Sequence, residues 1–452
     1  MNQIQKIALI YLLALSFLMY GYSVGRLKVF PYEFIEGFVK DYQAFAAGDP
    51  LEKKTSVAEK IKSDLGLSFD RFLYNYPRHA GNKTKATDHP TLKERKEPPR
   101  VFIHPEHRSG YRVIIGAFNL SESFWGGLLL NSTGEIIHTW QLSTDHLPTN
   151  KAADNLKNLY GVHVFPDGSV IFSMHESGGG IVKVDACSKI VWGLKGEYHH
   201  AISPDENKNI WSFVGKTAAF DQDMVRVSVI TGEVNKIIKM TDVREANPDI
   251  HIWDLQTKAW GKNFKRQRAK GNMTHGNDIE PLPAHLSDAF PMFNPGDLII
   301  SYATTNLIFV LDPKTLKIKW WRVGISSYQH DPDWEPNGEI AIFNNNLRVK
   351  KYGNIVSINP VTYKSKILLD GKPPLNFTPG INGRHQLTPF GTRMVTSAQQ
   401  GWAFEMDENG KIVFSFLNNT NFEEKKSLHL SEAWRFNNDY FERPFWEDCN
   451  QL

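Results

Sequence analysis

Cysteine and excess charge are both scarce in this chain of 452 residues. It has two cysteines, Cys187 and Cys449, and a formal net charge of +3. Two cysteines exclude a disulfide framework and leave two alternatives, a single bridge in an oxidising compartment or two separate thiols. The small net charge does not indicate a nucleic acid partner. No P-loop or dinucleotide fingerprint is present, and we predict no cofactor.

Long hydrophobic runs are also rare, and the clearest one lies near the start of the chain. Residues 7–24 are apolar apart from small and aromatic residues, with Lys6 before them and Arg26 and Lys28 after them. Eighteen residues is about the minimum that spans a bilayer. A cleaved signal peptide is the alternative, but no clear cleavage motif follows. We therefore predict a signal anchor over 1–29, with the rest of the protein on the periplasmic or other extracytoplasmic side.

The pattern of apolar residues changes along the chain. Residues 31–77 carry apolar residues at helical spacing, and residues 78–99 are polar and contain prolines. The sequence thus predicts a helical stalk and linker over 30–99. From residue 100 the period becomes 2, which is typical of strands. A short tail over 437–452 completes the chain.

A strand–turn–strand unit repeats from residue 100 onward. Its turns begin at residues that favour tight turns, with separations of 54, 46, 81, 47 and 48 residues, and these are Asn131, Asp185, Thr231, Asp312, Asn359 and Asp407. A second hairpin lies between copies, for example at 161–173 and 335–343. We attribute the long interval to an insertion around 241–295. A period near 50 with four strands per unit is typical of a β-propeller blade.

Six copies predict an all-β, six-bladed β-propeller over 100–436. An all-β sandwich is the structural alternative, but it does not require such a regular unit. The innermost strand of each propeller blade lines the central channel, so residues at equivalent positions converge there. Histidine recurs at the start of these predicted strands, and the candidates are His163, His199, His200, His275, His330 and His385.

The spacing of these histidines indicates a shared site. His275, His330 and His385 are each 55 residues apart, one blade at a time. The register is imperfect, because His330 lies six residues before Pro336 whereas His385 lies four before Pro389. A single histidine is usually only a hydrogen-bonded polar residue. Because a repeat unit does not need histidine to fold, histidines that recur at one blade position indicate a shared role. We therefore predict that the histidines surround one pocket on the propeller axis.

The pocket's chemistry follows from its charged neighbours. Several imidazoles could bind a metal, but Arg348, after the strand at 340–343, adds a permanent cation that favours a sulfate or phosphate oxyanion instead. We predict no metal, and interpret Asp331 and Asp333 as turn and hydrogen-bonding residues. An imidazole can also attack the sulfur or phosphorus of an ester and form a covalent intermediate.

The stretch "HDPDWEPNGEIAIFNNNLR", residues 330–348, resembles bacterial arylsulfotransferases. These enzymes are six-bladed propellers that transfer a sulfuryl group between phenols without a nucleotide donor. The resemblance implies that His330 and Arg348 bind the sulfuryl group and that His385, in "GRHQLTPFG", is the nucleophile. It implies a third catalytic histidine, which matches His275, His199 or His200. We add His163, Asp331 and Asn345 as predicted substrate-binding residues.

We predict a sulfotransferase that uses an aryl sulfate donor and a phenolic acceptor. Two alternatives remain open at this point. One is a membrane-anchored propeller without catalytic activity that binds a protein or glycan, since the fold alone does not define function. The other is an ester hydrolase in which water replaces the acceptor.

Overall fold

The computed structural model describes part of the chain, namely residues 15, 20, 73–74, 99–105, 107–120, 123–143, 158–175, 180–215, 222–252, 275–346, 352–373, 375–380, 382–421 and 426–449. The chain divides into two units, Met1–Arg71 and Phe72–Leu452. In the first unit only Leu15 and Tyr20 are described, and both are helical. Apart from these two residues the predicted anchor lies outside the described residues, as does nearly all of the predicted stalk and linker. Within the described part of the chain, no helix has both the length and the hydropathy needed to cross a membrane.

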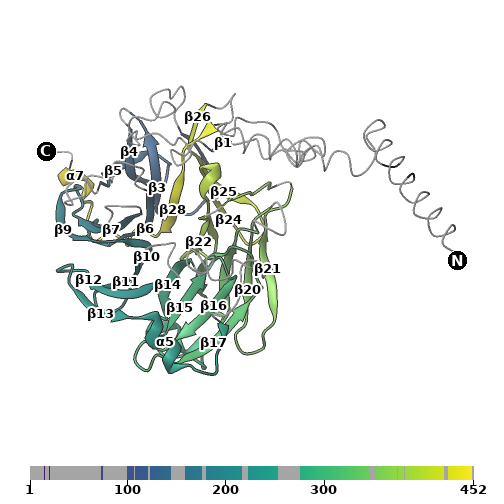
Figure 1. The fold of residues 1–452 in the computed structure, drawn as a ribbon. Coiled ribbons are helices and arrows are strands. Elements are labelled where there is room, and N and C mark those ends of the chain that lie inside the picture. Colours follow the sequence, from purple (N-terminus) through teal and green to yellow (C-terminus); the bar gives the residue numbers. More distant parts are fainter. Residues whose placement is uncertain are drawn as a thin grey trace. The chain divides into compact units, whose positions relative to one another are not determined.

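The second unit contains six antiparallel sheets arranged around an axis (Figure 1). Each contains at least four strands in order from the axis outward, with alternating side chains packed against the neighbouring sheets. This is the predicted six-bladed β-propeller. The strands of the first three blades are β28 (Leu430–Phe436), β3 (Tyr111–Asn119), β4 (Ser123–Leu130) and β5 (Ile136–Gln141); β6 (Asn158–Val164), β7 (Val170–His175), β8 (Gly180–Val184) and β9 (Ile190–Lys195); β10 (Tyr198–Pro204), β11 (Asn209–Val214), β12 (Asp223–Ser228) and β13 (Val234–Ile238).

The other three blades follow in chain order, and the last carries a fifth strand at its outer edge. Their strands are β14 (Gly276–Pro281), β15 (Leu298–Tyr302), β16 (Leu307–Leu311) and β17 (Ile318–Val323); β18 (His330–Trp334), β19 (Ile340–Asn344), β20 (Asn354–Ile358) and β21 (Ser365–Asp370); β22 (Arg384–Leu387), β23 (Arg393–Ser397), β24 (Trp402–Met406), β25 (Ile412–Leu417) and β2 (Arg100–Ile103). The smaller elements are β1 (Leu73–Tyr74), β26 (Asn419–Asn421), β27 (Lys426–Ser427), α5 (Met240–Ala246), η4 (Ala284–Ala289), η5 (Ala398–Gln400) and α7 (Trp446–Cys449).

The ring is closed by the C-terminal strand. β28 pairs with β3, so the first blade combines the two ends of the propeller sequence. The inner strands contact one another in the closed order β6, β10, β14, β18, β22, β28 and back to β6. Each junction between neighbouring blades contains its own cluster of buried apolar side chains, such as Phe343 with Val395 and Phe404. A small hydrophobic core between every two blades replaces one central core, which leaves the axis available for polar residues.

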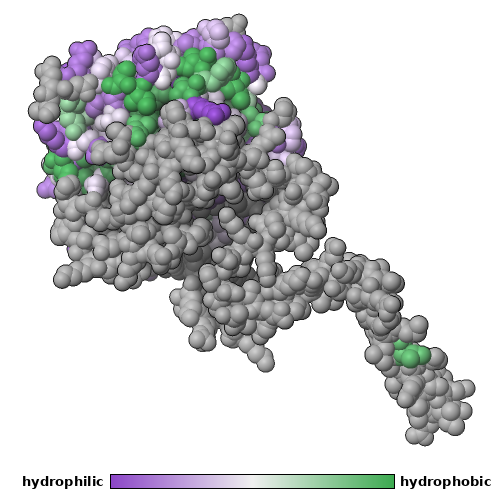
Figure 2. Space-filling model, turned by 90° about the horizontal axis from the view of Figure 1, so that it is seen from above, coloured by the Kyte–Doolittle hydropathy of each residue, from purple (hydrophilic) through white to green (hydrophobic). Residues whose placement is uncertain are grey.

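The outer strands carry the exposed apolar residues of the blades. Phe102, Val191 and Trp321 lie on β2, β9 and β17, and they are 52%, 52% and 41% exposed. On the described part of the face drawn in Figure 2, hydrophobic side chains lie among hydrophilic ones. Single exposed apolar residues of this kind are normal on protein surfaces.

Two predicted details of the repeat are wrong. The residue that anchors the turn of the β10–β13 blade is Ser228, whose hydroxyl accepts hydrogen bonds from the backbone of Ile230 and Thr231. Thr231 therefore lies inside the turn rather than at its start. The predicted insertion at 241–295 also contains β14, the inner strand of the next blade.

A disulfide bond joins the two cysteines. Cys187, in the β8–β9 turn, is bridged to Cys449 at the end of α7, 262 residues later in the chain. Of the two alternatives that the sequence left open, the structure has the bridge. It fastens the C-terminal helix to the second blade, beside the aromatic contacts of Phe445 with His138 and Trp140.

Candidate active site

Three imidazoles and a guanidinium line one pocket at the axis. Its described walls are formed by residues from five inner strands and the segments that lead into them, Leu159, Tyr160, His200, His330, Asn382, Arg384, His429 and Ser431. The cavity between them is about 10 Å³, which is room for one water-sized group. An oxygen atom bound there would therefore contact several of these side chains at once.

Backbone irregularities position the first imidazole. The pairing of β10 with β11 shifts register between His199 and Ser203, and His200 has φ of 55° within that bulge. Bulges redirect side chains next to binding sites. The Ser173 hydroxyl donates a hydrogen bond to the His200 carbonyl oxygen (3.0 Å) and accepts one from the backbone N–H of Gly161 (3.2 Å). The neighbouring blade thus fixes the backbone at His200.

The other two imidazoles also reach the pocket from the start of inner strands. His330 is the first residue of β18, and His429 directly precedes β28. The rings of His200 and His330 are 6.4 Å apart, and His275 lies edge-on to His200 at 4.9 Å between ring centroids. Burial lowers the pKa of His330 well below its ordinary value, and the charges of Arg384 and His275 lower it further. His330 is therefore neutral at physiological pH.

Arg384 is the permanent cation of the site. Its Nη1 lies 2.7 Å from Asp331 Oδ1 and 3.5 Å from Asp278 Oδ1, and its Nε lies 3.5 Å from Glu432 Oε2. Although burial alone lowers the pKa of the Arg384 guanidinium, these three carboxyl groups raise it above its ordinary value. Burial raises the pKa of Asp278 to about 7, against the opposing effect of Arg384.

His385 occupies a different place from the other predicted histidines. Arg384 pairs with Thr396 and His385 with Val395 on β23, and successive side chains of a strand point to opposite faces. Arg384 therefore faces the pocket, and His385 is not among the residues that line it. The His385 side chain is fully buried, with Nδ1 3.0 Å from Asp333 Oδ2 and 3.2 Å from an Arg393 nitrogen.

The remaining predicted site residues are distributed around the pocket. Behind the pocket, His199 contacts His200 and Asn345 contacts His330. Asp331 binds Arg384 and the backbone N–H of His385. His163 packs edge-on against Phe165 and Trp434 and does not line the pocket. Arg348 lies outside the described residues, so its role stays a prediction.

Sequence reasoning missed Arg384 and His429. The signal for Arg384 was the imperfect register, because it lies five residues before Pro389 and β22 lacks the extra residue that bulges out of β18 at Asp331. If the bulged residue Asp331 is left out of the count, His330 lies five positions before its turn proline, as Arg384 does. Arg384 and not His385 is therefore the equivalent of His330. His429 follows the sixth turn anchor in "KKSLHLSEAW", but the closing strand belongs to the first blade and has no repeat partner after it.

One group of described residues has the spacing of metal ligands, Asp331, Asp333 and His385, with ligand atoms within 4.8 Å of one another. Guanidiniums already contact this group, since Arg384 binds Asp331, and Arg393, which pairs with Glu335, lies against His385. The group therefore forms part of a buried ion-pair network below the pocket.

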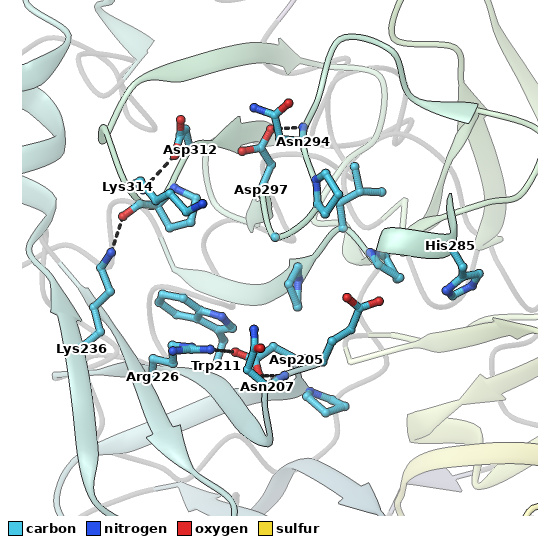
Figure 3. Close-up of a pocket in the computed structure, with 18 residues that line it drawn as sticks. Asp205, Asn207, Trp211, Arg226, Lys236, His285, Asn294, Asp297, Asp312 and Lys314 are labelled. Atoms are coloured by element: carbon cyan, nitrogen blue, oxygen red, sulfur yellow. Dashed lines mark hydrogen bonds and ion pairs between the residues drawn. The ribbon is translucent and has the colours of Figure 1, made fainter. Parts of the chain in front are cut away.

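A larger cavity of about 660 Å³ opens between the blades of β10–β13 and β14–β17 (Figure 3). Two of the cations that line it already have partners. Arg226 binds Asp205, and Lys236 donates to the carbonyl oxygen of Pro313. It contains none of the predicted site residues, and the oxyanion chemistry points instead to the axial pocket.

One comparison with known proteins identifies the family of the chain. The family model for Arylsulfotransferase (ASST) matches residues 161–419, more than half of the chain. The chain belongs to this family, which suggests that it is a transferase acting on small molecules. The matched segment includes His200, His330 and Arg384 and ends before His429. No curated protein matches the chain.

Solved structures resemble the chain only distantly. A protein of unknown function from Bacteroides caccae shares 11% identity, with 73% of this chain and 99% of that chain covered and a TM-score of 0.47. Virginiamycin B lyase from Staphylococcus aureus shares 12% identity, with 57% and 69% covered and a TM-score of 0.35. At these values neither likeness bears on the function.

Proposed function

We propose that this protein transfers a sulfuryl group from an aryl sulfate to a phenol, without a nucleotide donor and through a sulfohistidine. The observation that supports this most is the convergence of His200, His330, His429 and Arg384 on one small pocket. Transfer of a sulfuryl group mainly requires positioning and stabilisation of negative charge on its non-bridging oxygens. The charged guanidinium and the imidazole N–H groups supply those interactions.

The reaction balances in two steps. A ring nitrogen attacks sulfur, the S–O bond to the aryl group breaks, and the phenolate leaves and takes up a proton. The oxygen of the acceptor phenol then attacks the same sulfur and loses its proton, and the S–N bond breaks to restore the imidazole. No oxidant, metal or nucleotide is needed.

We assign the nucleophile to His429 in place of His385. His429 lines the pocket beside His330, whereas the His385 side chain is fully buried and engaged with Asp333 and Arg393. Burial also lowers the pKa of His385 to about 4. An imidazole held away from the pocket cannot approach the sulfur without a rearrangement of β22.

The test measures covalent labelling of the purified protein. Incubation with 4-nitrophenyl sulfate should release nitrophenol faster when a phenol is present, and should add the mass of one sulfuryl group to the peptide that contains His429. His429→Ala should abolish both signals. His285→Ala, which removes an imidazole from the larger cavity, is the control and should retain them. Label on His385 would return the nucleophile to that residue, and no label with no turnover would refute sulfuryl transfer.

We also propose that the propeller works outside the cytoplasm, anchored through residues 7–24. The Cys187–Cys449 bridge supports an oxidising compartment. Cell fractionation with protease added to intact spheroplasts tests this. A soluble, protease-protected protein would refute it.

A further inference from the structure

Gln222 is a buried glutamine behind the pocket, and its orientation is fixed by the backbone. The N–H of Gly276 donates a hydrogen bond to Gln222 Oε1 (2.7 Å). A backbone N–H can only donate, so the amide oxygen must face Gly276. The Gln222 NH₂ group then faces His199, with Nε2 to Nε2 at 3.1 Å. Gln222 and His199 are both 0% exposed.

This orientation determines the hydrogens of the next two rings. Because the Gln222 amide donates, His199 Nε2 accepts, and a neutral His199 carries its hydrogen on Nδ1. His199 Nδ1 lies 2.8 Å from His200 Nδ1. His200 Nδ1 must therefore accept, which leaves the hydrogen of a neutral His200 on Nε2. The opposite tautomer of His200 would place two N–H groups against each other.

Asn345 fixes His330 in the same way. Its Nδ2 lies 2.5 Å from the carbonyl oxygen of Tyr328 and 2.8 Å from His330 Nδ1. A carbonyl oxygen only accepts, so this position must be the NH₂ group, and a flipped amide would set two oxygens against each other. Its second hydrogen is then available to His330 Nδ1, at 2.8 Å, and we assign Nδ1 as the acceptor. The hydrogen of His330 is therefore also on Nε2.

We infer that Gln222, acting through His199, and Asn345 are positioning residues that hold His200 and His330 with hydrogen on Nε2. The resting pocket then offers two neutral imidazole N–H donors beside Arg384, and neither ring offers an Nε2 lone pair. Both histidines bind sulfuryl oxygens and do not attack sulfur. This inference rests on the proposed function for its role, but the hydrogen positions stand independently of it.

The first experiment observes the hydrogens directly. The full-length protein is labelled with ¹⁵N-histidine, and the resonances are assigned by single histidine substitutions. At pH 7 we expect protonated-nitrogen shifts for His200 Nε2, His330 Nε2 and His199 Nδ1. Hydrogen on Nδ1 of His200 or His330 would overturn the inference. If the tautomers are as stated but the protein transfers no sulfuryl group, only the proposed function fails.

The second experiment tests the positioning role with Gln222→Leu. Loss of the amide donor should leave His200 in a mixture of tautomers and weaken the binding of inorganic sulfate about tenfold, the effect of one neutral hydrogen bond. The KM for an aryl sulfate should rise by a similar factor. Gln400→Leu removes a buried glutamine that does not line the pocket and is the matched control for stability. Unchanged tautomers and unchanged sulfate affinity in Gln222→Leu would overturn the positioning role.

Discussion

The Arg384 guanidinium and the Asp331 carboxylate form a buried ion pair at 2.7 Å between the inner strands of adjacent blades. Asp331 occupies the bulge of β18, with φ of 56°, and its second oxygen accepts the backbone N–H of His385. One carboxylate thus holds both the guanidinium of Arg384 and the backbone of β22. The site depends on this pair because it directs the permanent positive charge toward the pocket.

Replacement of Arg384 should therefore affect stability and anion binding together. Arg384→Gln leaves three buried carboxyl groups without their cation, and removal of one partner of a buried ion pair typically costs about 3–5 kcal/mol of unfolding free energy. Urea unfolding measures this loss, and isothermal titration with sulfate measures the binding. Arg226→Gln, at a partly exposed ion pair in the larger cavity, is the control and should cost less and leave sulfate binding intact. Normal sulfate affinity in Arg384→Gln would contradict the assignment of the anion site.

The Asp278 carboxyl should give the protein a distinctive pH dependence. Burial raises its pKa to about 7, whereas the value in an unfolded chain is about 4. Between these values the folded state binds a proton that the unfolded state releases. The contribution of this group to stability is therefore complete below pH 4 and is lost as the pH rises through 7.

Asp278→Asn isolates that contribution, because asparagine does not titrate. The free energy of unfolding of the variant, relative to the parent protein, should increase between pH 5 and pH 8 in urea titrations. Asp167→Asn, in an exposed turn, provides the comparison. A difference that stays constant over this range would show that Asp278 does not titrate there.

Loss of the disulfide should destabilise the C-terminal closure. The bridge spans 262 residues of sequence, and removal of a native bridge typically costs about 2–5 kcal/mol. Cys187→Ser and the reduced parent protein should unfold at similarly lowered temperatures in calorimetry, since both lose the same constraint on the unfolded chain. A substituted protein as stable as the oxidised parent would indicate that α7 is held by its aromatic contacts alone.

Gly161 is required by close packing against the His200 backbone. A Cβ at this position would lie 1.8 Å from the His200 carbonyl oxygen and 2.9 Å from Ser173 Oγ. Gly161→Ala should therefore displace His200, lower the free energy of unfolding by about 1–3 kcal/mol and weaken sulfate binding. Gly391→Ala is the control variant. Nothing lies within 4 Å of a Cβ added at Gly391, so only its φ of +77° opposes the substitution. Equal sulfate affinity in both variants would argue against a link between Gly161 and the pocket.

Much of the fold followed from local pattern. The turn residues and the alternation of apolar side chains predicted six units of four strands, and six blades are present. The position of His330 near the axis was also predictable. The Pro-Asn-Gly turn marks the hairpin of β18 and β19, and His330 begins the inner strand of that hairpin. These features depend on interactions between residues close in sequence. The same local pattern occurs in each blade, so it could be recognised several times in the sequence.

The composition of the pocket depended on features that local pattern does not contain. A one-residue bulge is present in β18 and absent from β22, and since strand side chains alternate, that single residue decides whether Arg384 or His385 faces the axis. His429 reaches the pocket only because the last strand pairs with the first blade. The bridge between Cys187 and Cys449 likewise arises from ring closure. The sequence by itself determined the blades and the kinds of side chain near the axis, whereas only the tertiary structure decided which of them meet, because bulges and ring closure act across residues that are distant in the chain.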